Sequence, residues 1–146
     1  ASRRLLAERE GVALVASIPP TPVIADVDPA RVEQILLILL DNAIKHTPGG
    51  GKITVGVGAE RGAATLTVRD TGAGIPTEAQ PFIFDRFYQA DASREGLGLG
   101  LGLSIARGLA EAHGGSVDGR SAQGVGSVFI VRLPLTAPSP LVSGVA

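Results

Sequence analysis

The chain has 146 residues, of which 45% are hydrophobic, so it can bury one good core and is expected to form a single domain. Its 13 basic and 14 acidic residues give a net charge of −1 without any basic block, which argues against a nucleic-acid partner. Cysteine is absent and the two histidines are isolated, which excludes disulfides and both thiolate and histidine-rich metal sites.

The sequence carries no visible membrane-spanning or targeting segment. Its longest apolar run, Ile35–Leu40, is far too short to cross a bilayer. Methionine is absent, even at position 1, so we interpret the chain as a domain of a longer protein, with no signal peptide in this part. We expect a cytoplasmic domain that makes no direct membrane contact, whether or not the parent is a membrane sensor.

A short helix and two short strands are predicted at the start of the chain. Ser2–Arg9 has helical composition, and Gly11 is well placed to end the helix. Val12–Ile18 is apolar and β-branched, which favours a strand. Three prolines then interrupt the chain, and we predict a second strand at the short apolar segment Val23–Ala25.

A long buried helix is predicted next. Asp28 before Pro29 is a helix-start signal, because the acidic side chain can cap the first turn and proline is favoured at its first position. The helical pattern continues to Thr47. It is apolar on all sides over Ile35–Leu40, which indicates deep burial.

A β-hairpin follows this helix. Lys52–Ala59 and Ala63–Arg69 both alternate as strands do, and Glu60–Gly62 joins them. The second strand leads into the turn-rich segment Asp70–Pro76. A short helical turn is predicted at Thr77–Gln80.

The segment Gly96–Arg107 combines a glycine-rich loop with the start of a helix. Four glycines at every second position weaken both helix and strand, which predicts sharp bends or a close approach to a ligand. From Leu101 the apolar residues recur every three to four positions, which predicts an amphipathic helix to about His113. Because unpaired N–H groups point out of a helix start, this junction suits phosphate. A mobile linker or a glycine-faced strand is the alternative.

Two strands and a tail are predicted for the end of the chain. Ser116–Gly119 begins a strand, and Gly126–Pro134 supplies the last one, with apolar residues alternating between its faces. Thr136–Ala146 is rich in proline and weakly patterned. We expect it to be a disordered tail.

Three polar residues on the predicted buried helix could form part of a site. Asn42, Lys45 and His46 share one helix face, since they lie at positions i, i+3 and i+4. An amide oxygen can bind Mg²⁺ and an ammonium group can contact phosphate. The alternative is that the helix simply reaches the surface at its C-terminal end, where basic residues favour the helix dipole.

Asp70 and Arg94 are further candidates. Asp70 ends a strand, and the glycines after it would let a flat ring approach the backbone, so its carboxylate could accept a hydrogen bond from the amine of adenine. It could also be an ordinary turn residue. Arg86 and Arg94 precede the glycine loop. Arg94 is the expected phosphate contact because it lies closer to that loop in the sequence. Either arginine could instead be a solvated surface residue.

Six segments, each a weak signal alone, together resemble in their order the ATP-binding catalytic domain of sensor histidine kinases, a member of the GHKL or Bergerat-fold superfamily. The resemblance covers about residues 1–134. The segments are LLDNAIKHT (Leu39–Thr47, the N box), DTGAGIP (Asp70–Pro76, the first glycine box), FDRFYQ (Phe84–Gln89, the aromatic box), GLGLGLSIAR (Gly98–Arg107, the second glycine box), EAHGG (Glu111–Gly115) and GVGSVFIVRLP (Gly124–Pro134, the third glycine box).

The resemblance implies a role for each matching residue. Asn42 would ligate Mg²⁺, Lys45 would contact phosphate, and both, with Arg94, are the predicted catalytic residues. Asp70 would accept from the adenine amine. The other implied nucleotide-binding residues are His46, Gly72, Gly74, Ile75, Gly98, Leu99, Gly100, Leu101, Gly102, Leu103 and Ser127, the last of which would hold a water on the adenine.

The resemblance also implies a fold and a set of partners. The fold is a two-layer α/β sandwich, with a mixed sheet of about five strands covered on one face by three helices, over residues 1–135 and with 136–146 as the tail. The implied reaction transfers the γ-phosphoryl group of ATP·Mg²⁺ to a histidine of an upstream dimerisation domain. The receiver domain of a response regulator would then accept this phosphoryl group. The parent protein would be a homodimer.

The implied lid spans about Gln89–Leu99, and its base would be anchored by Phe84 and Phe87. His113 is expected to be structural. In the family a second asparagine usually stands where this chain has Ile38, and smaller residues usually stand at Leu97 and Leu99. These departures put catalytic strength in doubt more than nucleotide binding.

Three alternative functions remain open from the sequence. If Ile38 and Leu99 leave the pocket inactive, the domain would be a nucleotide-binding regulatory module with weak or no kinase activity. Neither His46 nor His113 lies in the family's acceptor motif, so this domain is not expected to complete the reaction without the acceptor-histidine domain. A GHKL-type ATPase usually has a glutamate on the N-box helix to activate water, whereas the nearest acids here are Glu33 and Asp41. A domain that binds no nucleotide is the last option.

Overall fold

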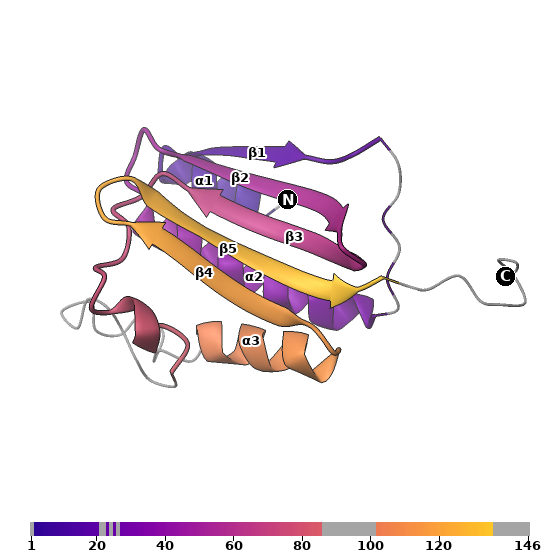
Figure 1. Cartoon of the computed structure of the whole chain (residues 1–146). Coiled ribbons are helices and arrows are strands. Elements are labelled where there is room, and N and C mark those ends of the chain that lie inside the picture. The colour runs from indigo at the N-terminus through magenta and orange to yellow at the C-terminus, as the bar shows by residue number, and fades with distance from the viewer. Residues whose placement is uncertain (1, 21–22, 24, 26, 86–101, 136–146) are drawn as a thin grey trace, which may run out of the picture.

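The computed structural model describes residues 2–20, 23, 25, 27–85 and 102–135 (Figure 1). Over these residues the chain forms three α-helices, one 3₁₀ helix and five strands. In order they are α1 (Ser2–Arg9), β1 (Ala13–Ser17), α2 (Pro29–His46), β2 (Lys52–Glu60), β3 (Ala63–Asp70), the 3₁₀ helix η1 (Gln80–Phe82), α3 (Gly102–Ala112), β4 (Ser116–Ala122) and β5 (Gly126–Pro134).

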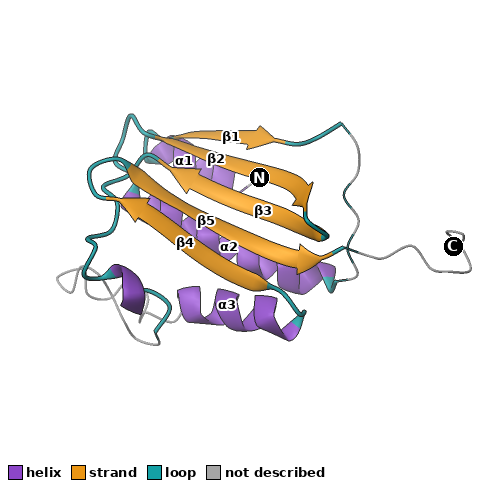
Figure 2. Cartoon of the chain, in the orientation of Figure 1, coloured by secondary structure: helices purple, strands orange, loops and turns teal. Residues whose placement is uncertain are grey.

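The strands form one mixed sheet in the order β1-β2-β3-β5-β4. β1 runs parallel to β2, and the remaining neighbours are antiparallel. In Figure 2 α1 and α2 lie behind the sheet and α3 lies along its β4 edge, and residues of all three helices join one buried core. The predicted two-layer α/β sandwich with a mixed sheet is therefore confirmed, and the other face of the sheet carries no described helix.

Helix α2 has the boundaries that its sequence predicts to within one residue. Asp28 caps it, because its Oδ1 accepts from the N–H of Ala30 at 3.0 Å, and proline follows in the first turn. At the other end the hydroxyl of Thr47 donates to the carbonyl of Ala43 at 2.6 Å, and the backbone of Thr47 is already extended. The buried face of the helix consists of Ile35, Leu39, Leu40, Ala43 and Ile44.

His113 joins the end of α3 to the start of α2. Its Nδ1 lies 2.8 Å from the carbonyl of Leu109, and its Nε2 accepts from the N–H of Asp28 at 3.3 Å. A carbonyl can only accept, so the ring is neutral with its proton on Nδ1. His113 thus has the structural role expected of it, at the far end of α3 from Gly102.

Two predicted elements differ from the structure, and a third, β4, starts as predicted and continues further. The segment predicted as a strand at Val23–Ala25 forms only an isolated bridge between Ala25 and Leu135 among its described residues. The neighbouring prolines lack the N–H groups that a continuous ladder needs. The predicted helical turn at Thr77–Gln80 is shifted, with turns there and the 3₁₀ helix after them. β4 extends past Gly119 to Ala122 because it pairs with β5 along its whole length.

Truncation of Leu39 should test the packing between α2 and the sheet. Leu39 is fully buried, so Leu39→Ala should lower the free energy of unfolding by about 2–5 kcal/mol, through lost burial and the cavity left behind. Leu5→Ala is the control, since Leu5 is 62% exposed and its truncation should change that energy by less than about 0.5 kcal/mol. Equal losses in urea unfolding would contradict this assignment of the core.

Candidate functional site

The site is built around the Asp70 carboxylate, which β3 places at its last position. Asp70 is 5% exposed, and its Oδ1 accepts from the backbone N–H of Gly72 at 2.8 Å and of Ser127 at 3.3 Å. Neither bond uses Oδ2. The backbone thus orients the carboxylate and leaves its second oxygen to accept from a ligand.

Burial raises the pKa of the Asp70 carboxyl above its ordinary value of 3.8, because a low-dielectric environment disfavours the charged form. The N–H groups of Gly72 and Ser127 act in the opposite direction, and the nearby His46 also lowers the pKa slightly. Desolvation is the largest of these effects. A carboxylate kept in such a place at a cost in stability is typical of a binding site.

The loop after Asp70 fits closely between α2 and β4. A Cβ at Gly72 would collide with the carbonyl oxygen of His46 at the end of α2. Gly74 has a φ of 78°, and a Cβ there would collide with the carbonyl oxygen of Ala122 at the end of β4. Only glycine fits at these two positions, as expected for a loop that shapes a pocket.

The predicted residues of α2 lie beside this loop. Asn42 and Lys45 are half-buried and His46 is exposed, in the last turns of the helix. One turn before Asn42, Ile38 meets the start of α3, since a Cβ at Gly102 would lie 3.4 Å from its Cγ2. The structure therefore brings the N-box helix, the first glycine box and the first residue of α3 together.

The remaining predicted residues divide into two groups. Ile75 and Leu103 are partly buried and pack against the core, and Ser127 lies opposite Asp70 in the β3–β5 pairing. The predicted residues Arg94, Gly98, Leu99, Gly100 and Leu101, together with Arg86, Phe87 and the predicted lid, lie outside the described residues.

Phe84, from the predicted base of the lid, belongs to the core. Its ring meets that of Phe129 edge to face, with centroids 6.1 Å apart, and the guanidinium of Arg107 lies 5.0 Å from its centroid. The aromatic box therefore acts here through packing, as predicted for Phe84.

Two side chains that the sequence analysis did not single out also hold the loop. Ser121 on β4 and Gln80 in η1 both bond to the backbone of Ile75. No local pattern marks them, because Ser121 is 46 residues from Ile75 in the sequence.

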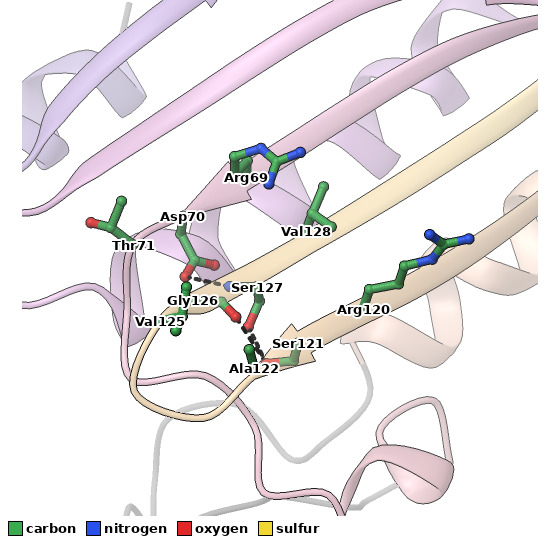
Figure 3. Close-up of a pocket in the computed structure, with 10 residues that line it drawn as sticks. All are labelled: Arg69, Asp70, Thr71, Arg120, Ser121, Ala122, Val125, Gly126, Ser127 and Val128. Carbon is green, nitrogen blue, oxygen red and sulfur yellow. Dashed lines mark hydrogen bonds between the residues drawn. The ribbon is translucent and has the colours of Figure 1, made fainter.

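A hollow of about 360 Å³ reaches Asp70 and Ser127 at this end of the sheet (Figure 3). It is also lined by Arg69, Val128 and Arg120, which are in register across β3, β5 and β4 and face away from α2. The hollow therefore lies at the end of the sheet and is lined by residues from both of its faces. It shares two residues with the predicted nucleotide site, whereas Asn42 and Lys45 lie on the helical side.

The described part of the chain contains neither a metal-binding cluster nor a membrane-spanning helix. It contains no group of three or more His, Cys, Asp or Glu side chains that could hold a metal ion. None of its helices combines the length and apolar character needed to cross a membrane.

A buried carboxylate among glycines, facing a polar helix end, defines a candidate site for a purine nucleotide in an α/β sandwich. The family described as histidine kinase-, DNA gyrase B-, and HSP90-like ATPase matches residues 27–137, and the chain belongs to this family. Sensor histidine kinase TmoS of Ectopseudomonas mendocina is 41% identical over 136 residues, which are 91% of this chain and 14% of TmoS. The histidine-protein kinase AfsQ2 of Streptomyces coelicolor is 46% identical over 119 residues, 80% of this chain and 21% of AfsQ2.

Solved structures agree with this assignment. The mycobacterial sensor histidine kinase MprB has a TM-score of 0.78 at 28% identity, with 92% of this chain and 91% of that chain covered. Full-length ShkA, in complex with AMPPNP, has a TM-score of 0.81 at 33% identity, with 96% of this chain and 29% of that chain covered. The resemblance to the ATP-binding domain of sensor histidine kinases is thereby confirmed, and the chain spans a small part of the curated relatives named above.

The fit of Gly74 against β4 can be tested by comparison with Gly62, which has nearly the same φ, 79° against 78°. A side chain at Gly62 would meet no atom within 4 Å, so Gly62→Ala should cost about 1–2 kcal/mol of backbone strain alone. Gly74→Ala adds the collision with Ala122 and should cost about 1–3 kcal/mol more. Urea unfolding of both variants measures the difference, and equal losses would rule out the tight contact.

The raised pKa of Asp70 predicts a pH dependence of stability. As pH rises from 3.8 toward the raised pKa, the unfolded state ionises first, so the folded state loses stability that is fully present at lower pH. Asp70→Asn removes this loss, because its amide oxygen still accepts from Gly72 and Ser127 without a charge. The variant should therefore gain stability relative to the parent as pH rises through this window, in urea unfolding at a series of pH values. Parallel curves would contradict the raised pKa.

Proposed function

We propose that this domain binds ATP with Mg²⁺ and transfers the γ-phosphoryl group to a histidine of a dimerisation and phosphoacceptor domain elsewhere in its parent protein. The receiver domain of a response regulator would then accept the group, and the parent would act as a homodimer in two-component signalling. The observation that carries the proposal is the buried Asp70 carboxylate, fixed by two backbone N–H groups beside the polar end of α2. The bound AMPPNP of ShkA supports it by analogy.

The adenine end of the proposed site is formed by Asp70 and the glycine loop. Oδ2 of Asp70 would accept from the exocyclic amine, for which the carboxylate must be ionised. Gly72 and Gly74 leave room for the flat ring next to backbone, and Ile75 offers it an apolar contact. Ser127, opposite Asp70 on β5, would hold a water against the base.

The phosphate end would lie between α2 and the start of α3. Asn42 is half-buried and one turn from Ile38, which meets Gly102, so its amide oxygen fits a cation shared with phosphate oxygens. Lys45, Arg94 and the backbone at Gly98, Gly100 and Gly102 would hold the phosphates. His46 would lie against the nucleotide. Mg²⁺ would neutralise charge that develops on the transferred group.

Positioning would account for most of the catalysis in this proposal. Phosphoryl transfer requires little covalent work from the protein, so alignment and charge neutralisation dominate. The acceptor imidazole is largely neutral near pH 7 and can attack without a strong base. A regulatory module that only binds nucleotide is the second candidate, because apolar Ile38 occupies the position beside Gly102 where the family usually has an asparagine.

Asn42→Ala should separate the metal's role from nucleotide binding. We expect it to abolish the gain in affinity for an ATP analogue that Mg²⁺ provides, and to lower transfer to a separately made acceptor domain at least about tenfold. Calorimetric titration with and without Mg²⁺ and labelled ATP measure both effects.

Glu33→Ala is the matched control, since Glu33 is exposed on the same helix, more than two turns before Asn42. It should leave binding and transfer unchanged. If the parent chain binds the ATP analogue but transfers no phosphoryl group to the acceptor domain, the regulatory module is favoured. If the parent chain hydrolyses ATP and Glu33→Ala abolishes this hydrolysis, a GHKL-type ATPase is favoured. Normal Mg²⁺ dependence in Asn42→Ala would overturn the proposed metal site.

A further inference from the structure

The hydroxyl of Ser121 joins three backbone segments at the edge of the proposed adenine site. Its Oγ accepts from the N–H of Ile75 at 2.6 Å and donates to the carbonyl of Gly126 at 3.1 Å. It also lies 2.9 Å from the Oγ of Ser127. These contacts tie the first glycine box to the end of β4 and the start of β5. Figure 3 shows the contacts of Ser121 with Gly126 and Ser127.

One arrangement of the hydroxyl protons satisfies all three contacts. A carbonyl cannot donate, so the single proton of Ser121 must point to Gly126. The proton between the two hydroxyls must then come from Ser127. Consequently Ser127 has no proton left for a ligand, and its Oγ can only accept there.

The side chain of Gln80, in η1, also connects the first glycine box to β4. Its Nε2 donates to the carbonyl of Ile75 at 2.9 Å and to the carbonyl of Ser121 at 3.2 Å. Both partners can only accept, so the amide nitrogen must face them. Gln80 and Ser121 therefore hold Ile75 by its carbonyl and its N–H, and the N–H of Gly124 donates to the carbonyl of Ala73 at 2.7 Å beside them.

Asp70, Ser127 and Ser121 form a cross-strand row at one end of the sheet. Asp70 pairs with Ser127, and Ser127 pairs with Ser121. Ser127 is on the same side of β5 as the buried Phe129 and Val131, so the row faces the helical layer, as the proposed nucleotide does.

We propose that Ser121, supported by Gln80, is a positioning residue that sets the base specificity of the site. This inference rests on the proposed function. Ser121 fixes the loop that carries Gly72 and Gly74, and it holds Ser127 as an acceptor next to the Asp70 carboxylate. A base edge that offers donors, such as the amine of adenine, is then favoured directly or through a water, whereas the carbonyl oxygen of guanine would face two acceptors.

The test compares affinities for ATP and GTP, measured by calorimetry on the 146-residue chain. Ser121→Ala should lower the affinity for ATP about tenfold, the effect of one to two lost hydrogen bonds. It should also lower the ATP-to-GTP preference, because the freed Ser127 proton can donate to guanine. Ser121→Thr keeps the hydroxyl and should restore both values.

Two further variants separate positioning from general destabilisation. Ser116→Ala alters the same strand at its other end, on the opposite face, and should change neither value. Gln80→Glu keeps the shape but replaces the donor by an acceptor, and should lower ATP affinity as Ser121→Ala does. If Ser121→Ala does not fold, Ser121→Cys replaces it, since a thiol is a weak hydrogen-bonding group of similar size.

The preference ratio is the decisive readout, because a loss of folded protein lowers both affinities together and leaves the ratio unchanged. A reduced ratio in Ser121→Ala with recovery in Ser121→Thr supports the proposal. An unchanged ratio and ATP affinity in Ser121→Ala would overturn it while leaving the ATP site intact. If the parent chain binds no ATP, the proposed function fails, and this inference fails with it.

Discussion

Burial of one face of α2 against the sheet is the constraint on which the site depends. With Ile35 and Leu39 in the core, the rotation of the helix about its axis is fixed. That rotation sets the direction of Asn42 and brings Ile38 against the start of α3. It also places the carbonyl of His46 directly over Gly72. The packing of α2 in the core therefore determines the geometry of the site.

The carboxylate of Asp70 is held by backbone groups. Among the described residues, Asp70 is oriented by two peptide N–H groups and forms no ion pair, so its negative charge is only partly compensated by that part of the chain. Such a carboxylate is costly to bury but discriminates strongly between a donor and an acceptor. The loop glycines serve the same purpose, because each removes a side chain where another segment's carbonyl must come close.

Local signals in the sequence predict much of this fold. The capping Asp28, the hairpin and the last strand depend on neighbouring residues and occur where they are predicted. Strand order and the length of β4 depend on pairing between distant segments, which a local pattern does not contain. The prediction of a strand at Val23–Ala25 is wrong for a related reason, because apolar residues alone do not form a strand without a continuous partner.

For the site, motif order predicts the residues that are brought together, namely Asp70, Gly72, Gly74 and the polar end of α2. Ser121 and Gln80 could not be predicted in this way, because their role depends on distances across the fold and on the number of protons a hydroxyl carries. The roles assigned to individual residues remain predictions, and those of Arg94 and Gly98–Leu101 fall outside the described residues.

The link between α3 and α2 has a chemical consequence for His113. An imidazole can attack a phosphoryl group only through a ring nitrogen whose lone pair is free, and here one nitrogen carries the proton while the lone pair of the other points at a peptide N–H. This residue is thereby withheld from nucleophilic chemistry by its place in the scaffold. Under the proposed function, in which a histidine elsewhere accepts the phosphoryl group, this hydrogen bonding would keep His113 from competing for that group.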